Sequence, residues 1–86
     1  KAFFGTAIKE IIIPSKVKEI GWYSFAGCGK LKKITIKSKK IKSIGKGAFS
    51  NIHAKAVFDV PNKSIKKYKN LLVKSKSFKN RKVKVK

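Results

Sequence analysis

The chain has few of the residue types that build catalytic and metal sites. Its 86 residues include one cysteine, Cys28, one histidine, His53, and no methionine. A single cysteine excludes an intrachain disulfide and a cysteine metal cluster. The sequence also lacks a Ser-His-Asp set, a paired-carboxylate acid and base, and a metal-spaced cluster. We therefore expect no enzyme, and Cys28 is interpreted as a small buried residue in a turn.

Long hydrophobic runs are also missing. Residues 11–13 are three consecutive isoleucines, and such runs are far shorter than the roughly 20 apolar residues that span a bilayer. The glycines on either side of Cys28 lack the strand-to-helix context and the Gly-Lys-Ser/Thr sequence of a phosphate-binding loop. The sequence therefore predicts neither a transmembrane segment nor a bound cofactor or metal.

Acidic residues are scarce. Glu10, Glu19 and Asp59 stand against 24 lysines and arginines, which gives a net charge of +21. This excess attracts polyanions of any kind, such as nucleic acid, anionic lipid surfaces, acidic polysaccharide and cell-wall polymers, without choosing among them. Only Arg81 is an arginine. Arginine grips phosphate in a bidentate fork, whereas lysine acts as a solvated point charge. The composition favours solubility and loose electrostatic attraction over a dedicated nucleic-acid site.

What the sequence does contain is an internal repeat. Ile20-Gly21 followed by Phe25 returns 24 positions later as Ile44-Gly45 followed by Phe49, and a shortened copy opens the chain at Phe3. Such a period lies within the 20–29 residues of leucine-rich repeats. We expect the three phenylalanines to stack as a buried aromatic column. The glycine after each isoleucine is expected to permit a backbone conformation or a close approach that a Cβ would block.

Strand-like segments recur at nearly the same period. Residues 11–13 and 34–36 lie 23 positions apart, and residues 58–60 follow 24 positions later. In each segment the alternate residues would point inward. Stacked copies would then form a parallel sheet whose inner side fills a continuous core.

The repeat resembles the bacterial leucine-rich repeats of the BspA or treponemal type over about residues 2–61. The resemblance implies an α/β-type right-handed solenoid with a short parallel sheet and irregular or 3-10 return turns. It also implies a secreted or surface-attached bacterial protein associated with adhesion to host or matrix proteins. Ser24 and Lys37 depart from the family pattern. The residues that carry the resemblance are Pro14, Val17, Ile20-Gly21, Ala48-Phe49 and the pattern Cys28-x-x-Leu31-x-x-Ile34-x-Ile36.

The periodicity changes after Pro61. Apolar residues at helical spacing predict a short amphipathic helix over residues 63–73, with Asn62 or Ser64 as its N-cap. Residues 81–86 alternate strictly, which predicts a final strand with Val83 and Val85 inward. The sequence thus divides into leucine-rich repeats at 1–61 and a C-terminal capping unit at 62–86. The first repeat is cut through, so we expect the C-terminal portion of a longer protein.

The outward face of the sheet is the candidate binding surface, because solenoids present extended surfaces to their ligands. A solvated face without a ligand is the alternative. The repeat predicts three rows across the strands. They are Glu10, Lys33, Val57 and Lys82; Ile12, Thr35, Asp59 and Lys84; and Pro14, Lys37, Pro61 and Lys86. The candidate contact residues among them are Lys33, Thr35, Lys37, Asp59, Lys82 and Lys84.

Trp22 and Tyr23 complete the candidate site, because the next repeat has Lys46 and Gly47 in their places. Exposed, they could stack on sugar rings or anchor a partner. The alternative is that they cover the apolar side of the preceding repeat. The general tendency of aromatic residues to be buried favours that alternative.

The predicted function is a non-enzymatic, secreted or cell-surface adhesion scaffold that contacts a host or matrix protein or a glycan. A polyanion binder, attracting acidic cell-wall polymer or nucleic acid through its lysines, is the first alternative. A passive structural spacer is the second. Binding to a polyanion would weaken steeply with salt, because counterion release drives it.

Overall fold

A computed structural model describes residues 3–78 and 83–86 of the chain. The described residues form short strands, one 3-10 helix and one α-helix. In chain order these are β1 (Glu10–Ile13), β2 (Glu19–Ile20), β3 (Lys33–Ile36), β4 (Ser43–Ile44), β5 (Val57–Asp59), η1 (Asn62–Ser64), α1 (Ile65–Lys74) and β6 (Lys84–Val85).

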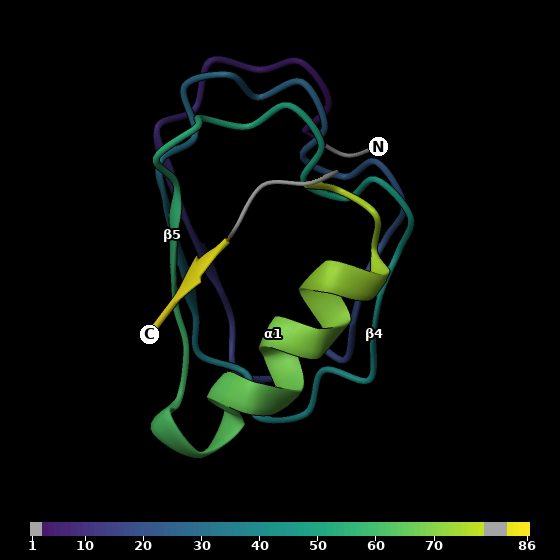
Figure 1. Cartoon of the computed structure of the whole chain (residues 1–86), viewed down its shortest axis with the longest axis vertical. Helices are drawn as coiled ribbons and strands as arrows, with labels where there is room; N and C mark the ends of the chain where they lie inside the picture. The colour runs from purple at the N-terminus through teal and green to yellow at the C-terminus, as the bar shows by residue number, and fades with distance from the viewer. Residues whose placement is uncertain (1–2, 79–82) are drawn as a thin grey trace.

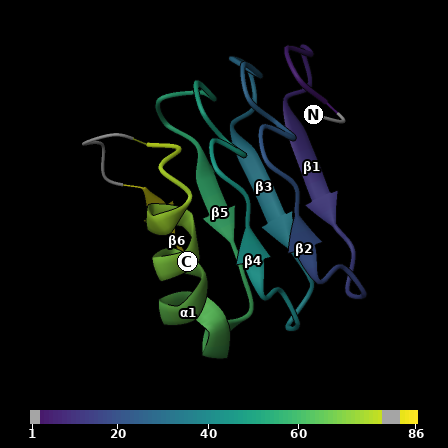
Figure 2. The same cartoon turned by 90° about the vertical axis from the view of Figure 1, so that its right-hand side faces the viewer.

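The strands form two parallel sheets on opposite sides of the stack. The larger sheet has the order β1-β3-β5-β6, and the smaller pairs β2 with β4. The first two repeats each contribute one strand to each sheet, whereas β5 and β6 belong to the larger sheet alone. The repeats lie side by side with α1 at one end (Figures 1 and 2). The pairing is in the register of the repeat, since Ile11 faces Ile34 and Ile34 faces Phe58.

The core lies between the two sheets and is built from the repeated apolar positions together with Tyr68, Leu72 and Phe78 from the C-terminal unit. Ile34 and Phe58 are fully buried. The predicted aromatic column exists. The rings of Phe3 and Phe25, and those of Phe25 and Phe49, are stacked with centroids 5.3 Å apart. Burial along the column is uneven, because Phe49 is fully buried whereas Phe3 is 45% exposed.

Neighbouring repeats approach each other closely at the glycine that follows β4. A Cβ at Gly45 would lie less than 3 Å from the backbone nitrogen and Cα of Trp22. The backbone of Gly45 is not left-handed, so close approach alone explains this glycine. Between repeats, the backbone N–H of Phe25 donates to the Ala48 carbonyl at 2.8 Å. Cys28 is fully buried, as predicted, and its thiol donates to the Phe3 carbonyl at 3.0 Å.

The predicted C-terminal helix is present at residues 65–74 and packs beside β4 (Figure 1). Ser64 is its N-cap but makes no side-chain cap hydrogen bond. The polar segment after the helix is buried at Ser75 and Ser77. The Ser75 carbonyl accepts from Gly47 N–H at 2.7 Å, and the Ser77 hydroxyl accepts from Phe49 N–H at 3.1 Å. These two serines therefore stand where a further repeat would supply acceptors.

The register predicted for the last strand is wrong by two residues. Lys84 faces Val57 rather than Asp59, and Val85 faces Phe58. Lys86 continues the strand by accepting from Val60 N–H and donating to the Phe58 carbonyl. A shift of two residues leaves the same side chains inward, so the alternation of the sequence cannot distinguish the two registers. Arg81 and Lys82, which the sequence also assigned to this strand, lie outside the described residues.

Candidate functional site: the outward face of the larger sheet

The outward face of the four-stranded sheet carries two rows of side chains from neighbouring strands. In each strand alternate residues point away from the core. The strand register aligns Glu10, Lys33, Val57 and Lys84 in one row. It aligns Ile12, Thr35 and Asp59 in the other row, and Lys86, which continues β6, follows Asp59 in that row. In β1, β3 and β5, the residues of both rows are those that the sequence predicted. Because parallel strands lie about 4.8 Å apart, an extended ligand lying across them would contact one strand of each successive repeat.

Two adjoining depressions hollow this face, and they share Glu10 and Lys33. The first has a volume of about 310 Å³ and is lined by Glu10, Ile11, Ile12, Lys33 and Thr35. Ile12 is 63% exposed in it, an unusual position for an isoleucine. The second, which we call the charged depression, has a volume of about 510 Å³. It is lined by Lys9, Glu10, Lys32, Lys33, Val57, Asp59 and Lys86.

The charged depression is lined by side chains of both charges. Four lysines line it, and it holds two of the three acidic residues of the whole chain. Lys9 and Lys32 occupy the same position before successive strands, and the Lys32 N–H donates to the Lys9 carbonyl at 2.9 Å. Val57 continues this arrangement, because its N–H donates to the Lys32 carbonyl at 2.9 Å. The backbone of three successive repeats therefore positions the residues of this depression.

The structure brings some of the predicted contact residues together and separates others. Lys33, Thr35 and Asp59 line the two depressions. Lys37 and Lys84 are exposed but line neither of them. The sequence interpretation omitted Lys9, Lys32 and Lys86 as contact residues. The signal for Lys9 and Lys32 was available, because both directly precede a strand and lie one period apart.

Trp22 and Tyr23 lie elsewhere, one residue beyond the end of β2 in the smaller sheet. Their favoured interpretation, as a cover for the preceding repeat, is wrong. Trp22 is 58% exposed, and its ring meets the Tyr23 ring edge-on with centroids 5.5 Å apart. The Tyr23 ring instead lies against the following repeat, where a Cβ on Gly47 would collide with it. The residue in the place of Tyr23 in that repeat, Gly47, also has a left-handed backbone with a φ of 67°, so the Tyr23 ring and the backbone conformation both favour a glycine there.

Outside this face, few of the described polar side chains are arranged for catalysis or metal binding. His53 uses its Nδ1 to accept from the Lys55 N–H at 2.9 Å, which closes a local turn. Within residues 3–78 and 83–86, no group of three His, Cys, Asp or Glu side chains is placed to hold a metal ion. Over the same residues, no helix has the length and apolar character needed to cross a membrane.

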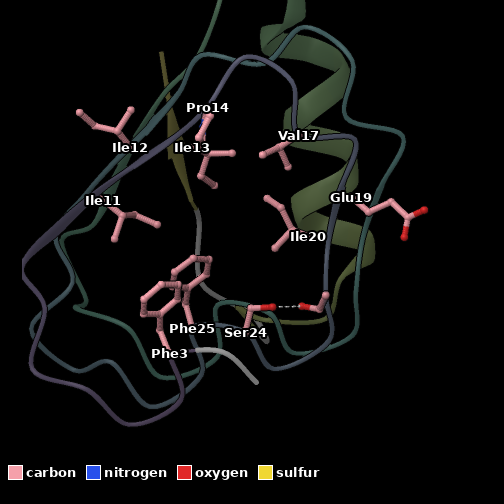
Figure 3. Close-up of a pocket in the computed structure, with 11 residues that line it drawn as sticks. Phe3, Ile11, Ile12, Ile13, Pro14, Val17, Glu19, Ile20, Ser24 and Phe25 are labelled. Atoms are coloured by element: carbon pink, nitrogen blue, oxygen red, sulfur yellow. Dashed lines mark hydrogen bonds between the residues drawn. The ribbon is translucent and has the colours of Figure 1, made fainter.

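A third hollow opens at the β1 end of the stack, with a volume of about 400 Å³. Phe3, Phe25, Ile13 and Ile20 point into it, whereas the Glu19 side chain points away (Figure 3). Its lining is almost entirely apolar, so it has the character of an uncovered core rather than of a polar binding site.

Comparison with known proteins gives one match. A family model described as "BspA type Leucine rich repeat region (6 copies)" matches residues 1–85. This match suggests a solenoid, a form with which the parallel strands and the single short helix agree. No curated protein and no solved structure matches the chain.

Proposed function

The chain belongs to the BspA-type leucine-rich-repeat family, and we propose that it is an adhesion module that binds its ligand on the outward face of the larger sheet. Members of this family generally serve as non-enzymatic binding scaffolds and are typically secreted or surface-associated in bacteria. We extend this to the present chain as a right-handed solenoid acting outside a bacterial cell. Residues 1–61 provide the binding repeats and residues 62–86 cover their end.

The observation that carries the proposal is the pair of adjoining depressions on the outward face. They place an exposed isoleucine, a half-buried threonine and opposite charges on one surface. Such a surface offers apolar contact, hydrogen bonds and charge to one ligand, which suits a protein or a glycan. A uniformly cationic face would suit a phosphate backbone better.

The test measures binding to immobilised extracellular matrix proteins and glycans by surface plasmon resonance. The variant Lys33→Ala/Thr35→Ala alters the face, and Lys16→Ala/Lys18→Ala is a control on exposed lysines outside both depressions. We expect the first variant to lose roughly tenfold or more in affinity and the control to stay close to wild type. Equal losses in both variants would contradict the assignment of this face.

Salt dependence separates the proposal from the polyanion binder that the net charge of +21 favours. A protein or glycan ligand held by apolar contacts and hydrogen bonds as well as by charge should lose less than about tenfold in affinity between about 50 mM and about 200 mM salt, even where the glycan is itself anionic. A ligand attracted through counterion release loses orders of magnitude over that range. The absence of binding under both conditions would favour a structural spacer.

A further inference from the structure

We propose that the charged depression binds an acidic polysaccharide, a chain whose sugar units each carry a carboxylate and free hydroxyl groups. This inference rests on the proposed function and names the ligand class of the same surface. It starts from the placement of the acidic residues. The chain has three carboxylates among 24 cations, yet Glu10 and Asp59 both lie in this one depression.

The cations of the depression supply the attraction for an anion. Lys9, Lys32 and Lys33 come from two neighbouring repeats, and Lys86 joins them from the end of the sheet. All four lysines are exposed, so their ammonium groups remain free to reach a ligand. Lysine ammonium groups act as point charges with three donors and place no demand on the plane of the carboxylate they meet. They therefore suit carboxylates presented at varied angles along a flexible chain.

The two carboxylates distinguish among anions. A nucleic acid or polyphosphate lying in this depression would bring its phosphates against Glu10 and Asp59, and like charges repel. Ionised carboxylates only accept hydrogen bonds, so their natural partners are hydroxyl or ammonium donors. A uronate sugar carries its anion and its hydroxyl donors on the same ring. It can therefore satisfy the lysines and the acids of this depression together.

The apolar residue in the charged depression, Val57, also agrees with this assignment. Val57 is half-buried at the middle of its row, between Lys33 and Lys84 in the register of the strands. It offers an apolar contact for the C–H face of a sugar ring. An acidic peptide fits less well, because its Asp and Glu side chains bring anions without hydroxyl donors.

The experiment measures affinities by isothermal titration calorimetry on the whole chain. The probes are an oligogalacturonate, a neutral dextran oligomer, inorganic polyphosphate and poly-glutamate. We expect the oligogalacturonate to bind more tightly than the other three probes at equal monomer concentration and about 200 mM salt. Tighter binding of polyphosphate or poly-glutamate would overturn the proposal in favour of a general polyanion surface or an acidic peptide, respectively.

Two variants with equal changes in charge locate the site. Lys32→Ala/Lys33→Ala should weaken oligogalacturonate binding roughly tenfold or more, because hydrogen bonds to charged groups are lost. Lys16→Ala/Lys18→Ala should change it less than about threefold. A loss of similar size in both would show attraction by the overall field and overturn the proposal. All four lysines are exposed, so neither variant should impair folding.

The sign of a third effect is the sharpest criterion. Glu10→Gln/Asp59→Asn should weaken oligogalacturonate binding roughly fivefold or more, since hydroxyl donors lose their charged acceptors. The same variant should strengthen polyphosphate binding, since two repelling charges are removed. Stronger oligogalacturonate binding by this variant would overturn the proposal.

The outcome for the proposed function is separate. If oligogalacturonate does not bind, but Lys33→Ala/Thr35→Ala still loses affinity for a matrix protein, the proposed function stands and the acidic-polysaccharide assignment fails. If that variant keeps full affinity for every extracellular ligand, both fail.

Discussion

The two ends of the repeat stack differ in how the apolar interior is covered. At the α1 end, Ser75 and Ser77 accept hydrogen bonds from the last repeat, and Phe49 and Phe58 are fully buried. At the β1 end, a hollow of about 400 Å³ opens between the sheets, and Phe3 is 45% exposed (Figure 3). The same repeat position is thus core at one end and surface at the other. Burial in this molecule depends on having a neighbour, as expected of stacked repeats.

The largest expected effect tests this difference along the aromatic column. Phe49→Ala should lower the free energy of unfolding by about 3–5 kcal/mol, because it empties a fully buried site. Phe3→Ala should cost only about 1 kcal/mol, chiefly the stacking contact with Phe25. Urea denaturation followed by circular dichroism measures both. Equal losses would show that exposure at the β1 end does not reduce the contribution of the ring.

The repeated glycine provides the next comparison. A Cβ at Gly45 would collide with the backbone of Trp22, whereas at Gly21 the nearest atom within 4 Å is the Ser24 Oγ at 3.1 Å. Gly45→Ala should destabilise the chain by about 1–3 kcal/mol through overpacking. Gly21→Ala should cost less than about 1 kcal/mol, because one hydroxyl has to move by a few tenths of an ångström. Thermal melting of the two variants side by side checks the order, which a larger effect at Gly21 would reverse.

An effect of similar size is expected where α1 contacts the preceding repeat. The buried Tyr68 hydroxyl donates to the Ser38 carbonyl at 2.6 Å and accepts from the Ile41 N–H at 3.3 Å. Tyr68→Phe keeps the ring but leaves both backbone groups without this partner. We expect a loss of about 1–3 kcal/mol. Faster hydrogen exchange at the Ile41 amide would support the assignment. Unchanged exchange and stability would contradict it.

The smallest effect should come from a serine at the start of α1. Ser64 occupies the N-cap position without a side-chain cap hydrogen bond, so Ser64→Ala should change the unfolding free energy by less than about 0.5 kcal/mol. Ser77→Ala, by contrast, removes the acceptor of Phe49 N–H and should cost about 1–2 kcal/mol. Chemical denaturation of the two variants measures both changes in the free energy of unfolding. A larger cost at Ser64 would mean that a cap bond forms in solution.

The repeat in the sequence was sufficient to predict the first three strands of the larger sheet, their parallel pairing and the outward residues of these strands. The strands of the smaller sheet, β2 and β4, were not predicted. Period-related residues such as Ile34 and Phe58 do pair, and the aromatic column forms. The prediction failed where the repeat stops. The strand β6 comes after α1, whose helical periodicity interrupts the repeat, so the repeat does not set the register of β6. A shift of two residues also leaves Val83 and Val85 pointing inward.

The candidate site was only partly predictable for a similar reason. Lys33, Thr35 and Asp59 follow from strand alternation, and the structure places all three in the depressions. Lys86 enters the charged depression through the shifted register, which no spacing in the sequence indicates. The position of Tyr23 against the following repeat depends on the space left by Gly47, a packing relation that alternation does not describe.

The sequence by itself determined the repeating unit of this protein, its inward residues and its cationic surface, because these follow from local periodicity and composition. The tertiary structure decided which copies of the unit are buried and which charges share a depression. Both depend on contacts between residues more than 20 positions apart. Glu10 and Asp59 are unremarkable in a list of residues, yet the stacking of three repeats gathers them among four lysines.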